Sequence, residues 1–125
     1  MIVILDFDGT VVSHEFPLIG NDIGAVPVLK TLINNGHKLV LFTMRCNNYL
    51  EEAVQWFRVN DIPLYGIQTN PTQSKWTSSP KAHGQLIIDD IAAGCPLKYD
   101  SKISEQPFVD WDKMKQILIN TGWIN

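Results

Sequence analysis

Two pairs of aspartates stand directly after short apolar runs of the sequence. Asp6 and Asp8 follow the β-branched run 2–5, and the adjacent pair Asp89–Asp90 follows a second apolar run. Carboxylates gathered in a partly dry site repel one another unless a cation neutralises them. Oxygen ligands without an accompanying His or Cys cluster favour Mg²⁺ over zinc. One such acid alone could equally be a helix cap or a turn residue, but two pairs after two strands predict a magnesium site.

The apolar runs predict buried strands of a parallel sheet, because they lack the polar alternation of a half-exposed strand. Between them lie stretches with apolar residues at helical spacing. In chain order we expect strands over 2–5, 39–43, 64–67 and 86–88, helices from Ala25 to Ile33, over 48–59 and after Asp110, and loops over 11–24 and 69–80. This alternation predicts a doubly wound α/β fold, a three-layer, Rossmann-like parallel sheet with right-handed crossovers.

The strand ends determine where a ligand should bind. In a doubly wound sheet, ligands bind beyond the carboxyl ends of the strands. Asp6, Thr43 and Asp89 each stand at or directly after the end of an expected strand. We therefore expect these three side chains to converge on one edge of the sheet, with Gly9 permitting a sharp departure of the chain from that edge.

These segments resemble, in order, the four motifs of the haloacid dehalogenase superfamily. The run Ile2–Val11, with Asp-Phe-Asp-Gly-Thr inside it, is similar to the first motif, and the strand that ends in Thr43 is similar to the second. Lys81, in Ser-Pro-Lys, is similar to the third motif, and the segment 86–90, Leu-Ile-Ile-Asp-Asp, is similar to the fourth. The first motif is fairly specific, and the four together span residues 2–90.

The resemblance implies a phosphatase that works through an aspartyl-phosphate. Asp6 would attack phosphorus, and Asp8 would protonate the leaving oxygen and then deprotonate the attacking water. Thr43 would hydrogen-bond a phosphoryl oxygen, and Lys81 would offset the negative charge of the nucleophile and the phosphoryl group. Lys75 competes with Lys81 as the motif lysine, and Lys81 is preferred because it lies nearer the fourth strand.

The resemblance also implies two sets of binding residues. The residues expected to contact the substrate or its phosphate are Gly9, Thr10, Thr43, Arg45 and Lys81. The residues expected to hold Mg²⁺ are Asp6, Asp8 through its main-chain carbonyl, Asp89 and, close by, Asp90. For Arg45 two interpretations stay open: a guanidinium that grips a second anionic group of the substrate, or a solvent-exposed arginine at a helix start.

The histidines and the exposed aromatic residues give weaker signals. His14, His37 and His83 lack mutual ligand spacing and are interpreted as ordinary loop residues, although His14 and His83 could approach the rim of the pocket. Trp76, in the loop before Lys81, could line a substrate entrance or pack in a core or interface. None of these residues changes the predicted chemistry.

The chain leaves no room for the cap domain that many members of this superfamily carry. The stretch between Thr10 and Thr43 is filled by one helix, one strand and a short loop, and that between Thr43 and Lys81 by one helix, one strand and a loop. The sequence therefore resembles the capless members, and residues 1–125 form one predicted domain. An open site suits a large phosphorylated substrate, or requires a homo-oligomer whose neighbouring subunit supplies a lid.

The composition of the chain limits the kinds of partner and compartment that are expected for it. The chain of 125 residues has a formal net charge of -3 and no basic cluster, so a stable nucleic-acid partner is not expected. The two cysteines are too few for a disulfide scaffold and predict reduced thiols in a cytoplasmic protein. The apolar start is interrupted by Asp6 and Asp8, which argues against a membrane span or an export signal.

Two other classes of protein remain as alternatives to the phosphatase. A receiver domain also uses acids, Thr and Lys with Mg²⁺, but its acidic pair comes early and its phosphorylated Asp follows a central strand, whereas this chain has the opposite order. A catalytically idle binding protein could keep the same fold, although no motif residue is missing from this sequence. A phosphomutase would need a cap to keep water from the intermediate.

Overall fold

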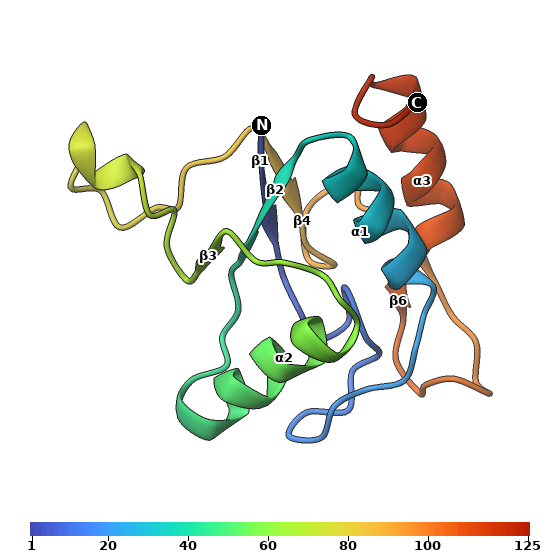
Figure 1. Cartoon of the computed structure of the whole chain (residues 1–125). Coiled ribbons are helices and arrows are strands. Elements are labelled where there is room, and N and C mark those ends of the chain that lie inside the picture. The colour runs from blue at the N-terminus through green and yellow to red at the C-terminus, as the bar shows by residue number, and fades with distance from the viewer.

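A four-stranded parallel sheet forms the centre of the molecule, which the computed structural model describes for residues 1–125 (Figure 1). Its strands are β1 (Ile2–Leu5), β2 (Lys38–Leu41), β3 (Gly66–Ile67) and β4 (Leu86–Ile88), in the order β3-β2-β1-β4. Leu5 pairs with Leu41 on one side and with Ile88 on the other, so three strands end at the same level. The predicted parallel α/β sheet is confirmed.

Three α-helices connect or follow these strands, close to where the sequence predicts them. They are α1 (Ala25–Asn34), α2 (Asn47–Val59) and α3 (Trp111–Asn120), with one 3₁₀ turn, η1 (Gln73–Lys75). Asp110 begins α3 as expected, because its side chain accepts a hydrogen bond from the Lys113 amide. A short antiparallel pair, β5 (Leu97–Lys98) with β6 (Phe108–Val109), was not predicted, since two-residue strands carry almost no sequence pattern.

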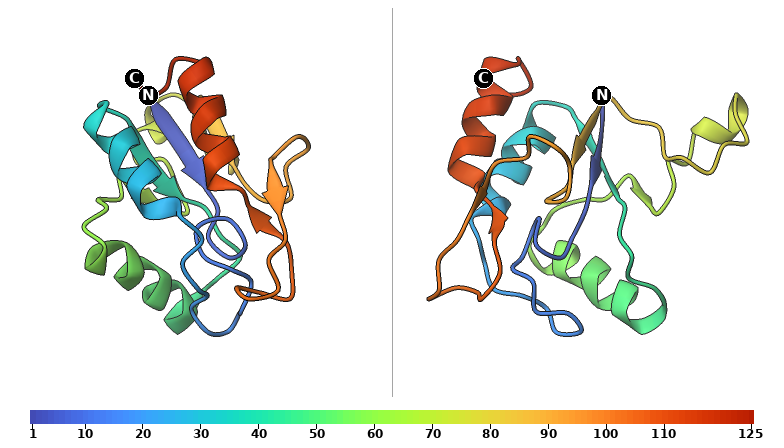
Figure 2. Two further views of the ribbon diagram at one scale, coloured as in Figure 1. Left: turned by 90° about the vertical axis from the view of Figure 1, so that its right-hand side faces the viewer. Right: turned by 180° about the vertical axis from the view of Figure 1, so that it is seen from behind.

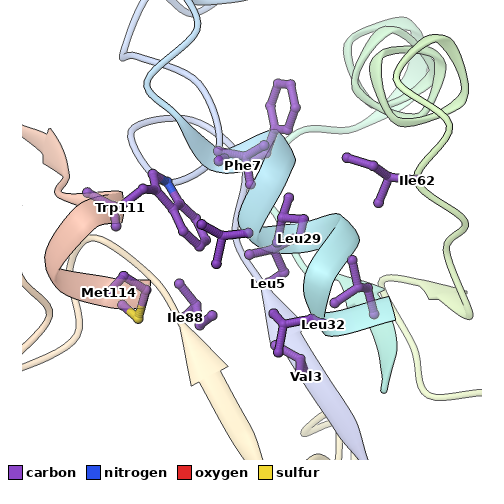
Figure 3. Packing of buried hydrophobic residues seen from close by; sticks show 14 of the residues in the cluster. Val3, Leu5, Phe7, Leu29, Leu32, Ile62, Ile88, Trp111 and Met114 are labelled. Atoms are coloured by element: carbon purple, nitrogen blue, oxygen red, sulfur yellow. The ribbon is translucent and has the colours of Figure 1, made fainter. Parts of the chain in front are cut away.

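All three helices contribute to one apolar core on one face of the sheet. Val3, Leu5 and Ile88 point from the strands toward Leu29 of α1 and Trp111 of α3 (Figure 3). α1 and α3 lie beside each other over this face (Figures 1 and 2). α2 joins the same core through the buried residues Ala53 and Phe57. This core fixes the strands, and therefore the residues at their carboxyl ends.

The opposite face of the sheet has no helix. Its buried residues Ile4 and Val40 form a small cluster with Ala82, against which only the partly buried Ile2 and Tyr65 pack, and Ile87 on the same face is 54% exposed. The chain crosses this side as an irregular segment that projects away from the sheet around η1 (Figures 1 and 2). The expected doubly wound, three-layer arrangement is therefore not confirmed, because the Pro-, Ser- and Thr-rich segment 69–80 forms only one 3₁₀ turn on this side and no α-helix.

Buried amide side chains hold the irregular segment together. The Asn70 amide donates to the carbonyl of His83, and the Gln73 amide donates to the carbonyls of Ser79 and Lys81. The His83 amide donates back to Gln73. These bonds replace the backbone ladder of a helix, which satisfies the polar groups of a loop that partly covers the sheet.

The chain carries no inserted unit around the strand ends. Between β1 and β2 it contains only a loop and α1, and between β2 and β4 it contains α2, β3 and η1. No further domain is inserted between these elements. None of the helices has the length and apolar character needed to cross a membrane.

Trp111 provides a test of the packing that fixes the first acidic loop. Its side chain is 2% exposed, and its Nε1 donates to the carbonyl of Thr10 at 2.8 Å. Trp111→Phe should lower the free energy of unfolding by about 1–3 kcal/mol, because the Thr10 carbonyl loses its partner. Trp76→Phe, at a side chain that is 65% exposed, is the matched control and should change it by less than about 0.5 kcal/mol. Equal losses in urea unfolding would contradict this account.

Candidate functional site

Three aspartates meet at the carboxyl edge of the sheet. The Asp6 amide donates to the Ile88 carbonyl at 3.0 Å, which extends the β1–β4 ladder by one residue and brings the two strand ends together. Asp6, Asp89 and Asp90 each place a carboxylate oxygen within 4.8 Å of the others, and all three are partly buried. The predicted meeting of the two acidic segments is therefore present in the structure.

Burial raises the pKa of Asp6 to about 7, and the negative charge of Asp89 adds to this effect. Hydrogen bonds from the Thr10 hydroxyl and the Phe7 amide act in the opposite direction but do not outweigh burial. Neither of the two ion pairs of the protein includes Asp6, so no basic side chain compensates its charge. The site thus holds negative charge that the protein itself leaves uncompensated.

Asp90 differs from its neighbour Asp89. Burial acts to raise the pKa of both, and for Asp89 it prevails, so that this pKa is raised. For Asp90 burial is again the largest single effect, but the hydrogen bonds with His14, Asp6 and Asp89 and the interaction with the charge of His14 together outweigh it, and the pKa of Asp90 is lowered. His14 Nε2 lies 2.7 Å from Asp90 Oδ2. The histidine was interpreted as a loop residue that could approach the rim of the pocket, and the fold shows its contact with Asp90.

Gly9 permits the close approach of that histidine. It has a φ of +78°, and a Cβ at this position would lie 2.0 Å from His14 Nε2 and 2.7 Å from Asp90 Oδ2. Its amide donates to the Val12 carbonyl. The Gly9 amide is therefore already paired, and the residue makes room for the His14–Asp90 contact, while phosphate binding by Gly9 stays a prediction.

Thr10 links the two acidic segments. It is fully buried, and its hydroxyl lies 2.7 Å from Asp6 Oδ2 and 3.2 Å from Asp90 Oδ1. The same oxygen accepts a hydrogen bond from the Asp90 amide at 3.0 Å. The single hydrogen of the hydroxyl is thus already donated to the carboxylates, and Thr10 positions Asp6 against Asp90; its expected contact with phosphate stays a prediction.

Asp8 lies outside the acidic cluster. Both of its carboxylate oxygens accept hydrogen bonds from Arg45, from Nε and from Nη2, each at 2.7 Å. Arg45 is 2% exposed. Both earlier interpretations of this arginine are therefore corrected: it is neither exposed to solvent nor free to grip the substrate, because its donors are used within the protein. The Asp8 carboxylate is absent from the set that could share a metal ion, and the expected contribution of its main-chain carbonyl stays a prediction.

Thr43 lies at the same edge, beyond β2. Phe42 donates its amide to the Leu5 carbonyl, so the chain stays beside the end of β1 as it reaches Thr43. The Gln68 side chain bonds both the amide and the carbonyl of Thr43, at 2.8 and 2.6 Å. The Thr43 hydroxyl oxygen accepts from the Arg45 amide, which leaves its own hydrogen available to a ligand. No sequence signal identified Gln68.

The two candidate lysines do not contact the acids. Lys81 is exposed and lines a shallow hollow with Ile87 on the open face of the sheet. Lys75 lies in η1, on the segment that projects away from the sheet (Figure 2). The expected contact between the motif lysine and Asp6 is therefore not present, and neither lysine takes part in an ion pair.

The donor set fits a hard divalent cation. Three carboxylate oxygens within 4.8 Å of one another, with a raised Asp6 pKa, mark a place where a positive charge would relieve repulsion. The nearby Cys95 thiol is not among the clustered ligand groups, and burial raises its pKa, so a soft metal finds no thiolate there. The residues that would hold the ion are Asp6, Asp89 and Asp90.

The fold and the site together define an α/β protein with an acid-lined edge on a parallel sheet. No family model and no curated protein matches the sequence. Among solved structures, a conserved protein from Bacteroides thetaiotaomicron is similar, with a TM-score of 0.78 and 30% identity over 97% of this chain and 91% of that one. The chain belongs to the same family as that conserved protein, whose description states no activity.

The raised pKa of Asp6 makes a prediction about stability. The pKa of Asp6 is 3.8 in the unfolded chain and about 7 in the folded protein, so the folded protein holds this proton more tightly. This contribution to stability is therefore present at low pH and is lost as the pH rises through about 7. Asp6→Asn should remove that loss and raise the free energy of unfolding at pH 8 by on the order of 2–4 kcal/mol.

Thermal and urea unfolding across pH 4 to 8 would measure this effect, with Mg²⁺ added in a second series. Mg²⁺ should stabilise the wild-type protein at pH 8 and have a much smaller effect on Asp6→Asn, because a cation offsets the same repulsion. If the free energy of unfolding of the two proteins changed with pH in the same way, the pKa of Asp6 would not be the one that is raised by folding.

Proposed function

We propose that the protein is a magnesium-dependent phosphatase of the haloacid dehalogenase type, which hydrolyses a phosphoric monoester through an aspartyl-phosphate on Asp6. The observation that carries this proposal is the uncompensated carboxylate of Asp6, clustered with Asp89 and Asp90 at the carboxyl edge of a parallel sheet. Such an edge is where α/β proteins bind ligands.

Side chains of the protein suit both steps of the reaction, the formation of the aspartyl-phosphate and its hydrolysis. Thr10 holds Asp6 Oδ2, so Oδ1 is the oxygen that attacks phosphorus in line as the bond to the leaving oxygen breaks. Asp8 gives a proton to that leaving oxygen, later takes one from water, and the water oxygen displaces Asp6 from phosphorus. Bound Mg²⁺ would offset the negative charges of nucleophile and phosphate. Thr43 donates its free hydroxyl hydrogen to a phosphoryl oxygen.

The leaving group meets an open and partly apolar rim. Phe16 and Tyr49 pack against each other with ring centroids 5.2 Å apart, and both are about half exposed. Leu18 and Met44 are exposed near them in the chain, at 70% and 97%. With no cap to close over it, this site suits a substrate larger than a free metabolite or a neighbouring subunit that excludes water.

A panel of phosphate monoesters tests the proposal. The wild-type protein should release phosphate with Mg²⁺ and stop when the metal is chelated, and Asp6→Asn should lose turnover because an amide cannot form the aspartyl-phosphate. Asp61→Asn, at an exposed position with a φ of +55°, is a matched control that should keep full activity. Phosphate release by Asp6→Asn, or indifference to the chelator, would reject the mechanism.

Lys81 supplies the ammonium in this proposal, although it makes no contact with the acids. It shares a hollow with Ile87, and Asp89 follows two residues later, on the same face of an extended chain. Two residues of strand span about 7 Å, a distance that a lysine side chain can cover once a phosphate draws it in.

Lys81→Met should lower kcat/KM by about 10²–10³, the usual loss for one group that stabilises the charge of the transition state. Lys75→Met, on the projecting turn, is the control and should leave kcat/KM unchanged. Steady-state kinetics of both variants would decide between the lysines. If Lys81→Met kept full activity, Lys81 would have no role in offsetting the negative charge of the transition state, and the metal alone would do so.

A further inference from the structure

Arg45 is the most completely engaged charged side chain of the protein. Beyond its two bonds to Asp8, its Nη2 donates to the Leu18 carbonyl at 2.8 Å and its Nη1 donates to the Tyr49 carbonyl at 3.2 Å. The guanidinium lies 5.1 Å from the Phe7 ring and 5.0 Å from the Phe16 ring. Its position is therefore determined by three segments of the chain in addition to its own.

The aspartate at the other end of this pair is held just as firmly. Both Asp8 oxygens bind the fork of one guanidinium, an arrangement that fixes direction as well as distance. Asp8 lies two residues after Asp6, yet its carboxylate is not part of the Asp6–Asp89–Asp90 cluster. Without the arginine, Asp8 would be an unpaired carboxylate two residues from Asp6, next to a site that attracts cations.

We propose that Arg45 is a positioning residue that keeps the Asp8 carboxylate out of the metal cluster and aimed at the leaving oxygen of the substrate. This inference rests on the proposed phosphatase function and gives Arg45 a role different from phosphate binding. The Leu18 and Tyr49 contacts hold loop 11–24 against the start of α2 at the same time. Loop 11–24 thus forms one wall of the site beside the start of α2.

The dependence of the reaction on its leaving group tests the role of Arg45. An alkyl phosphate such as glycerol 2-phosphate needs proton transfer to its leaving oxygen, whereas p-nitrophenyl phosphate has a leaving group that departs without it. Because kcat/KM reports the steps up to loss of the leaving group, Arg45→Met should lower kcat/KM for the alkyl ester by about 10²–10³. For the aryl ester it should fall only a few-fold.

Two further variants separate positioning from folding. Asp8→Asn should show the same substrate pattern, and the double variant Asp8→Asn/Arg45→Met should lose no more than Asp8→Asn alone, because Arg45 acts through Asp8. The double variant also removes both charges together, which avoids leaving one of them buried without a partner. Arg45→Lys keeps the charge but not the fork, and should recover only part of the activity toward the alkyl ester.

Arg58→Met is the control, since Arg58 is an exposed arginine at the other end of α2. It should keep wild-type kcat/KM for both esters. Equal losses of kcat/KM for both esters in Arg45→Met, a rise in KM alone, or additive losses in the double variant would overturn the positioning role. Absence of turnover by the wild-type protein with every ester would instead reject the proposed function, and the role of Arg45 in it.

Discussion

The concentration of negative charge at one edge of the sheet is the constraint to which the rest of the site responds. Burial favours the uncharged form of Asp6, and the nearby Asp89 strengthens that preference. The protein compensates only part of this charge: His14 faces Asp90, and Thr10 donates to Asp6. The remaining charge requires a proton or a cation, and this requirement links the stability of the fold to the proposed chemistry.

Two basic side chains divide the four acids into two groups. His14 contacts Asp90, which belongs to the metal cluster, and Arg45 holds Asp8, which does not. Both contacts also fix loop 11–24, because His14 belongs to it and Arg45 bonds its Leu18 carbonyl. A loop without regular structure is thereby ordered by the same interactions that arrange the acids, so binding of a cation or substrate and the order of this loop should be coupled.

The one-sided sheet explains why the site is open. Helices cover the face that carries Val3 and Leu5, and this single core is sufficient to hold the strand ends in register. On the other face the irregular segment 69–80 leads to Ala82, which covers only Ile4 and Val40. Neither a third layer nor an inserted domain covers the acidic edge, and in the proposed reaction the exclusion of water would have to come from the substrate or from another subunit.

The sequence by itself determined the four strands of the parallel sheet, the α-helices and the meeting of Asp6 with Asp89, because parallel strands place their carboxyl ends at one edge. It also indicated oxygen-ligand chemistry there, since carboxylates occur at that edge without histidine or cysteine ligand spacing. The partners of Arg45 and His14 were decided only by the tertiary structure. Each contact joins residues far apart in the chain, and local pattern carries no information about such pairs. The missing third layer likewise depended on whether segment 69–80 could pack as a helix, which its prolines and hydroxyl side chains disfavoured but did not alone decide.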